Sequence, residues 1–175
     1  MNPKDFLILL IVSFLWGGSF LFIRLLVLEG MEPLEIVSMR MLLASIFILP
    51  FLLNRSKKHS FKDHSLSFLL IGILNTALPF TLFAYASLQL GAGSLSVLQA
   101  TVPILTALIL FSLFKNEFSI SKLIGVLIGF VGLYVLVGPG SNFDLFSSIL
   151  CVVASLSYAV AAVSYTHLRA HETSL

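Results

Sequence analysis

The sequence predicts an all-α, polytopic membrane protein, and three observations carry that prediction. Of 175 residues, 58% are hydrophobic and only 10% are charged, with a mean hydropathy of +1.07, so the apolar surface exceeds what one soluble core could bury. Several apolar stretches approach the length of about 20 residues that a helix needs to cross a bilayer. The basic residues gather in alternate connections between these stretches. The lipid bilayer is therefore the first expected partner.

The apolar stretches follow one another with only short breaks that contain Gly, Pro or charged residues, such as 29–33, 90–93 and 138–140. The first stretch is too long for the core of a signal peptide and has no convincing small-residue cleavage site, so we interpret it as a permanent span. The predicted spans cover roughly 6–28, 34–53, 66–88, 92–114, 120–138 and 145–165.

The distribution of charge predicts the orientation of these spans. If the spans alternate, one side of the membrane receives Lys4, Arg55, Lys57, Lys58, Lys62, Lys115 and Lys122. The opposite connections hold Glu29, Glu32 and Asp144 and no Lys or Arg. Because cytoplasmic loops carry the excess of Lys and Arg, we expect a cytoplasmic N-terminus. The basic residues form no patch with interleaved aromatic residues, so we expect no nucleic-acid partner.

Two arginines lie inside apolar stretches. Arg24 stands near the outer end of the first span, where its side chain can reach the interface, and we favour that structural interpretation. Arg40 lies about a turn and a half into the second span, whose outer end carries Glu35. A guanidinium at that depth needs partners or a water-filled cavity, so Arg40 is a candidate substrate-binding residue, with a structural ion pair as the equal alternative.

An ordered set of motifs covers about residues 6–140 and resembles the EamA-type transporters of the drug/metabolite transporter superfamily. The chain has Asn116 where that family usually has Gly before Glu117, so only the carboxylate of that pair is retained. The motifs that carry the resemblance are Trp16-Gly17-Gly18-Ser19-Phe20, Arg40, Asn75 to Phe80, Phe83 to Ala86, Gln99 to Pro103, Glu117, Gly125, Gly129, Gly132 and Val137-Gly138-Pro139.

The resemblance implies a transporter of two inverted five-helix repeats, of which residues 6–140 would form one and 145–165 the first helix of an incomplete second. It further implies a secondary transporter, an exporter of amino acids or other small organic metabolites by alternating access in a bacterial inner membrane, present here as a truncated fragment. The alternative is a non-transporting assembly or regulatory protein of the membrane, in which the polar residues serve only helix packing.

Transport by alternating access requires polar groups deep in the membrane that can replace the hydration of a substrate. Trp16 offers an indole N–H and Tyr85 a hydroxyl, although both also suit ordinary packing. Asn75 and Gln99 are amides deep in their spans, where each must find a hydrogen-bond partner, and bonding between helices is the alternative role. Together with Arg40, these four residues are the candidate substrate-binding set.

Other residues are candidates for helix geometry, gating and association. Pro79 and Pro103 each free a backbone carbonyl in mid-helix and are candidate kinks. Glu117 is a candidate for gating or ion coupling, although an interfacial ion pair with Lys115 or Lys122 is favoured. Gly125 and Gly129 form a Gly-x-x-x-Gly pattern that allows close helix approach; we favour packing within one protomer over a homodimer face.

The sequence contains no catalytic constellation and no phosphate-binding P-loop, so we expect neither an enzyme nor a cofactor, and any transport would be secondary. Residues 166–175 form a polar tail that matches nothing expected in the family and resembles a vector-derived or frame-shifted terminus; a short cytoplasmic tail is the alternative. His167 and His171 stand four residues apart in it, but with no third ligand in the sequence we do not expect a metal site.

Overall fold

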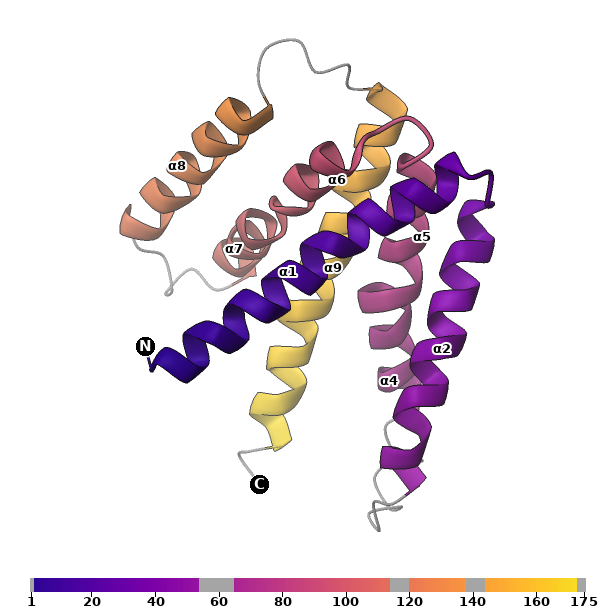
Figure 1. Ribbon diagram of the computed structural model, residues 1–175. Helices are drawn as coiled ribbons and strands as arrows, with labels where there is room; N and C mark the ends of the chain where they lie inside the picture. The colour runs from indigo at the N-terminus through magenta and orange to yellow at the C-terminus, as the bar shows by residue number, and fades with distance from the viewer. Residues whose placement is uncertain (1, 54–64, 114–119, 138–143, 173–175) are drawn as a thin grey trace.

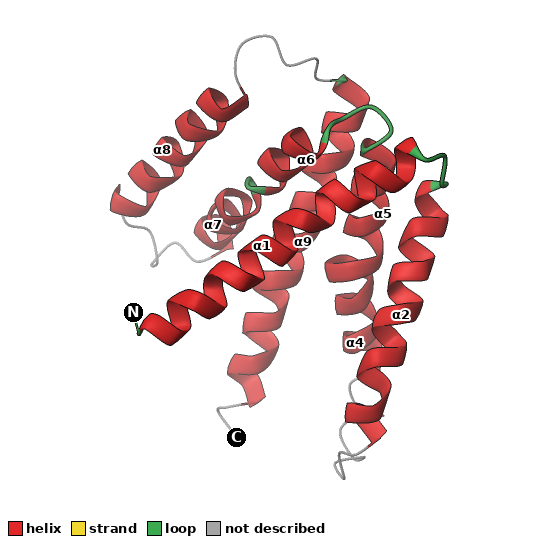
Figure 2. Cartoon of the chain, viewed as in Figure 1, coloured by secondary structure: helices red, strands yellow, loops and turns green. Residues whose placement is uncertain are grey.

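The computed structural model describes residues 2–53, 65–113, 120–137 and 144–172, and within them the chain is built from helices (Figures 1 and 2). The elements are α1 (Pro3–Leu28), α2 (Pro33–Leu53), α4 (Ser65–Gly72), the π-helical turn η1 (Ile73–Ala77), α5 (Leu78–Ala86), α6 (Ala92–Gln99), α7 (Val102–Leu113), α8 (Ile120–Val137) and α9 (Leu145–Glu172).

Five helical segments of the described chain are long and apolar enough to cross a membrane, which confirms the predicted all-α, polytopic class. Two of the five combine shorter elements, because α4, η1 and α5 join into one span and α6 and α7 into another. The segments are Pro3–Leu28, Pro33–Leu53, Ser65–Ala86, Ala92–Ser112 and Leu145–Ser164. The remaining predicted span, 120–138, corresponds to the 18-residue helix α8.

Helix α9 occupies the centre of the described fold. It packs against α5, η1 and α4 on one side and against α6 and α7 on the other. Figure 1 shows α1 crossing in front of α9, α2 lying beside α5, and α8 at the outer edge next to α7. The connections α1–α2 and α5–α6 lie at one end of the fold, while the N-terminus of α1 and the C-terminal end of α9 lie towards the other.

The turn between α1 and α2 explains why these helices form a hairpin. Gly30 has a φ of +91°, a left-handed conformation that glycine adopts without steric cost. Its N–H bonds to the carbonyl of Val27, and the N–H of Met31 bonds to that of Leu26, which is the Schellman arrangement that ends a helix. Pro33 then begins α2, where its missing N–H costs nothing.

The third and fourth spans are both interrupted near a proline. In η1 the N–H of Leu78 bonds to the carbonyl of Ile73 in the π-helical register, so the next bond would need an N–H on Pro79, which has none. The carbonyl of Leu74 instead accepts a hydrogen bond of 2.6 Å from the hydroxyl of Ser157 on α9. An interhelical bond therefore replaces the missing backbone bond.

The fourth span breaks between α6 and α7, two residues before Pro103. There the N–H of Thr101 turns back to the carbonyl of Leu98. The hydroxyl of Ser155 on α9 donates to that same carbonyl at 3.2 Å. Two serines of α9, Ser155 and Ser157, thus bond to backbone carbonyls at the two interruptions.

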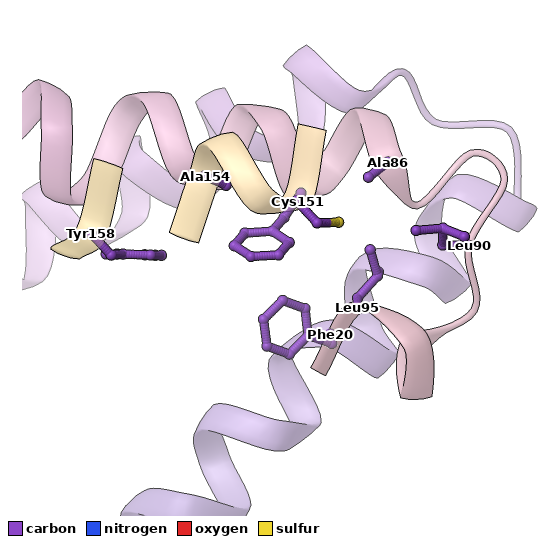
Figure 3. Close-up of a cluster of buried hydrophobic side chains, with 8 residues drawn as sticks. Phe20, Ala86, Leu90, Leu95, Cys151, Ala154 and Tyr158 are labelled. Atoms are coloured by element: carbon purple, nitrogen blue, oxygen red, sulfur yellow. The ribbon is translucent and has the colours of Figure 1, made fainter. Parts of the chain in front are cut away.

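The principal apolar core lies where α1, α5, α6 and α9 meet (Figure 3). The rings of Phe20 and Phe83 pack edge to face, with their centroids 5.3 Å apart. Small side chains of α9 allow these rings to approach its backbone. The buried members of the core are Phe20, Phe83, Ala86, Leu90, Leu95, Cys151, Ala154 and Tyr158.

Candidate functional site

Helix α1 brings two polar pairs together from distant parts of the sequence. The indole Nε1–H of Trp16 donates to Oε1 of Gln99 on α6 at 3.0 Å. Three residues later on α1, the hydroxyl of Ser19 accepts a hydrogen bond of 2.6 Å from Nη1 of Arg40 on α2. Because positions i and i+3 share one face of a helix, these two pairs lie on neighbouring turns of α1. The structure therefore places three predicted site residues, Trp16, Arg40 and Gln99, along one side of α1.

The half-buried guanidinium of Arg40 also lies over an aromatic ring. Its Cζ stands 3.9 Å from the centroid of the Phe80 ring on α5, a cation–π geometry that stabilises the charge where water is scarce. Within the described chain, Arg40 thus contacts a neutral hydroxyl and a neutral aromatic face. Neither of them compensates the positive charge.

Tyr158 of α9 completes this group and was not among the residues singled out from the sequence. Its ring meets that of Phe80 edge to face, with centroids 6.4 Å apart and planes at 90°. The Tyr158 side chain is 7% exposed, and its hydroxyl has no hydrogen-bond partner within the described chain. The sequence offers several tyrosines in apolar spans, of which Tyr85 was the predicted candidate, and it does not show which tyrosine lies beside Arg40.

Ser19, Phe80, Arg40 and Tyr158 form what we call the Arg40 cluster, contributed by α1, α5, α2 and α9 in that order. Four helices that are separate in sequence converge on it. Ser19 carried one usable signal, because it follows Trp16 by three residues and so shares its helix face. Phe80 carried none, since its role depends on the guanidinium above it.

The remaining predicted residues lie elsewhere. Asn75 is in η1 with an exposed side chain, next to Leu74, whose carbonyl binds Ser157. Tyr85 lines a separate open cleft of about 310 Å³ at the end of α5 near the start of α9. Glu117 lies outside the described residues. The structure therefore does not assemble all five predicted binding residues into one site.

Arg24 and one glycine of α8, Gly129, have structural contacts. Nη1 of Arg24 donates to the backbone carbonyls of Ser87 and Leu88, at the C-terminal end of α5, where a cation interacts favourably with the helix dipole. Gly129 of α8 faces Ile104 of α7, and a Cβ built on the glycine would lie 3.6 Å from the Cδ1 atom of Ile104. Gly129 thus packs against a neighbouring helix of the same protomer.

This arrangement defines a class of protein: a multi-pass membrane protein in which hydrogen-bonded polar side chains and two guanidinium groups lie within apolar spans. The comparison with known families agrees. The EamA-like transporter family matches residues 4–138. The chain therefore belongs to the EamA-like transporter family, which confirms the resemblance seen in its motifs.

Relatives named as transporters align with most of the chain. An uncharacterized transporter of Archaeoglobus fulgidus is 29% identical over 171 residues, covering 93% of this chain and 57% of the relative. The uncharacterized inner membrane transporter YedA of Escherichia coli is 32% identical over 152 residues, covering 85% and 49%. The uncharacterized transporter YdfC of Bacillus subtilis is 28% identical over 146 residues, covering 83% and 47%.

The chain spans about half of the length of these curated relatives. No solved structure matches it.

Proposed function

We propose that the protein carrying this chain is a secondary transporter of small organic metabolites, amino acids among them, that works as an exporter by alternating access. The observation that carries the proposal is the Arg40 cluster, a charged group inside apolar spans whose partners come from four different helices. Ionisable residues within membrane helices are costly and mark substrate or ion pathways.

The interruptions of the third and fourth spans support the same proposal. Broken helices with irregular backbone beside a polar site are a recurrent feature of transporters, because they supply polar groups and points of bending within the membrane. Here both interruptions are bonded to α9 through Ser155 and Ser157. A movement of α9 relative to α5 and α6 would therefore change the hydrogen bonding at both.

We further propose the membrane arrangement in which the N-terminus of α1 is cytoplasmic, in a cell inner membrane. The charge distribution supports it, because Lys4 and the basic connections fall on one side of alternating spans. In this arrangement residues 6–140 form one repeat and α9 begins a second, inverted one, as an odd number of spans per repeat requires. Homodimer formation through the Gly-x-x-x-Gly pattern stays a prediction.

Flux measurements on the full-length natural protein test the function. Proteoliposomes loaded with a mixture of radiolabelled amino acids should release them faster than protein-free liposomes that carry the same load. Arg40→Ala and Gln99→Ala should each reduce the flux by roughly tenfold or more, since hydrogen bonds to charged or buried groups contribute about 1.5–3 kcal/mol. Ser45→Ala is the control, because the Ser45 hydroxyl bonds only to the carbonyl of Met41 in its own helix.

The main alternative is a membrane assembly or regulatory protein in which the Arg40 cluster only joins helices. It predicts that Arg40→Ala and Gln99→Ala destabilise the protein in detergent. It also predicts that wild-type proteoliposomes show no flux above that of protein-free liposomes. If the wild-type protein transports and both variants show unchanged flux, the protein is a transporter, but these residues are not part of its substrate site.

A further inference from the structure

The Tyr158 hydroxyl is the polar group in the described core that the packing of the helices does not explain. The ring fits the apolar core well, with 7% of its surface exposed. Its hydroxyl is buried and makes no hydrogen bond to any described residue. An unsatisfied buried hydroxyl costs about 1–3 kcal/mol, and a phenylalanine would fill the same space without that cost.

Arg40, which contacts the same Phe80 ring, presents the complementary difficulty. A guanidinium carries five N–H donors in a planar fork, and one of them is engaged by Ser19. Its other contact is the face of Phe80. A cation held between apolar helices by neutral groups is stabilised further by a counter-charge within reach.

Both groups pack against the Phe80 ring. Arg40 lies 3.9 Å above the Phe80 ring, and Tyr158 meets that ring edge to face with the centroids 6.4 Å apart. Within the five described spans, the other basic residues are Lys4 and Arg24, which lie near span ends. Arg40 is therefore the basic residue available to a ligand at mid-span.

We propose that Arg40 and Tyr158 form an anion subsite that binds the carboxylate of a small organic acid, beside the apolar wall of Phe80. The guanidinium donates to one carboxylate oxygen or to both, and the phenol donates to one of them. The bound carboxylate accepts a hydrogen bond from the Tyr158 hydroxyl. It also supplies the counter-charge of Arg40. This inference rests on the proposed transport function and specifies the substrate class of that function.

The chemistry of the pair favours a carboxylate over other ligands. One guanidinium and one neutral hydroxyl match a single negative charge in a planar group. A phosphate dianion would retain an uncompensated charge in an apolar setting. An organic cation would be repelled by Arg40, and a neutral amide would leave the guanidinium without a counter-charge.

Calorimetric titration of the full-length protein in detergent tests the subsite with three probes: isocaproate, its neutral amide, and L-leucine, which adds an amino group to the same acid. We expect isocaproate and L-leucine to bind at least about tenfold more tightly than the amide, the effect of losing one charge-assisted hydrogen bond. Equal binding of isocaproate and its amide, or no binding of any acid, would overturn the proposal.

Two variants separate ligand binding from folding. Tyr158→Phe removes only the unpartnered hydroxyl, so it should leave the thermal unfolding temperature unchanged or raised while weakening isocaproate binding about tenfold. Arg40→Lys keeps the charge but not the planar fork and should bind weakly. Wild-type affinity for isocaproate in Tyr158→Phe would overturn the role of Tyr158 and with it the two-residue subsite.

The flux assay distinguishes failure of this inference from failure of the proposed function. If proteoliposomes transport isocaproate and L-leucine but not the amide, both proposals are supported. If they transport amides or amines as well as acids, the carboxylate subsite is wrong and the transporter remains. If they transport none of the solutes, the transport proposal itself fails.

Discussion

Helix α9 and the α1–α2 hairpin have similar hydropathy but opposite positions in the molecule. The most apolar 18-residue windows of α1 and α2 are each 11% buried, whereas that of α9 is 50% buried. The exposed side chains of the hairpin are large, with Phe14 and Phe47 at 81% and 75%. The buried side chains of α9 are mostly small, including Cys151, Ala154 and Ala159.

The difference shows what determines burial when lipid rather than water surrounds a helix. Lipid chains solvate leucine and phenylalanine as well as a protein interior does, so hydrophobicity gives no preference for the inside. Small residues allow helices to approach closely, and serine hydroxyls can bond to carbonyls of neighbouring helices. Helix α9 has both properties, and it occupies the centre.

We expect the largest change in the free energy of unfolding when alanine is replaced by leucine in α9 rather than in α2. Ala154→Leu in α9 adds three side-chain carbon atoms at a position that is 0% exposed, and we expect it to lower the free energy of unfolding by about 1–3 kcal/mol. Ala44→Leu in α2 is the matched control, because Ala44 is exposed and should tolerate the change. Chemical denaturation in mixed micelles measures both.

Equal losses for Ala154→Leu and Ala44→Leu would contradict the comparison. They would mean that α2 is covered as closely as α9 in the assembled protein. A loss confined to Ala44→Leu would reverse the assignment of the central helix.

The sequence predicted the helical class and the approximate spans because length and hydropathy determine these directly. It did not predict which helix is central, since Leu-rich and Ala/Ser-rich spans are both apolar by composition. Pro79 and Pro103 indicated the interruptions. A proline does not show, however, which group will donate a hydrogen bond to the carbonyl that it leaves without a backbone N–H. That donor, Ser157 for the carbonyl of Leu74, comes from a residue 83 positions away.

The candidate site, like the fold, could be predicted in part. The depth of Arg40 and Gln99 within apolar spans marked them as groups that need partners. Trp16 was found through its N–H donor, and the structure pairs it with Gln99. Tyr158 could not be found, because its importance lies in a hydroxyl that the surrounding helices leave unbonded. Such a feature exists only once four helices are placed together.

Hydrogen bonds made by serines also differ between α9 and α2, and we expect a smaller change in stability from them. Ser157→Ala removes the donor to the Leu74 carbonyl, and we expect a loss of about 0.6–1.7 kcal/mol, the range for hydrogen bonds between membrane helices. Ser45→Ala in α2 removes a bond to the carbonyl of Met41 in the same helix and should have almost no effect. The same denaturation experiment measures both variants.

If Ser157→Ala is as stable as the wild type, the bond does not join α9 to the interrupted span. A double variant with Ser155→Ala then tests whether the neighbouring bond to the Leu98 carbonyl compensates. A loss in the double variant larger than the sum of the single losses would show that the two serines act together.

The N-terminal caps of α9 and α1 should differ in how their stabilisation depends on pH, and this is the smallest change in stability that we expect. Asp144 precedes α9, and its carboxylate accepts hydrogen bonds of 2.8 and 2.7 Å from the N–H and hydroxyl of Ser147, which lower the pKa of Asp144. Asn2 caps α1 with an amide that does not titrate in this range. The stabilisation by Asp144 should therefore be complete above the ordinary aspartate pKa of about 3.9 and disappear as the pH falls through the lowered value.

The thermal unfolding temperatures of Asp144→Asn and the wild type, followed from neutral pH to about pH 3, isolate this contribution. Asparagine still caps a helix but does not titrate, so the difference between the two proteins should shrink as the solution is acidified. The reciprocal variant, Asn2→Asp, should give α1 the same acid sensitivity, since it places an ionisable cap at a helix N-terminus. A constant difference between wild type and Asp144→Asn at every pH would show that the charge of Asp144 does not stabilise α9, and the two helix starts would then be equivalent.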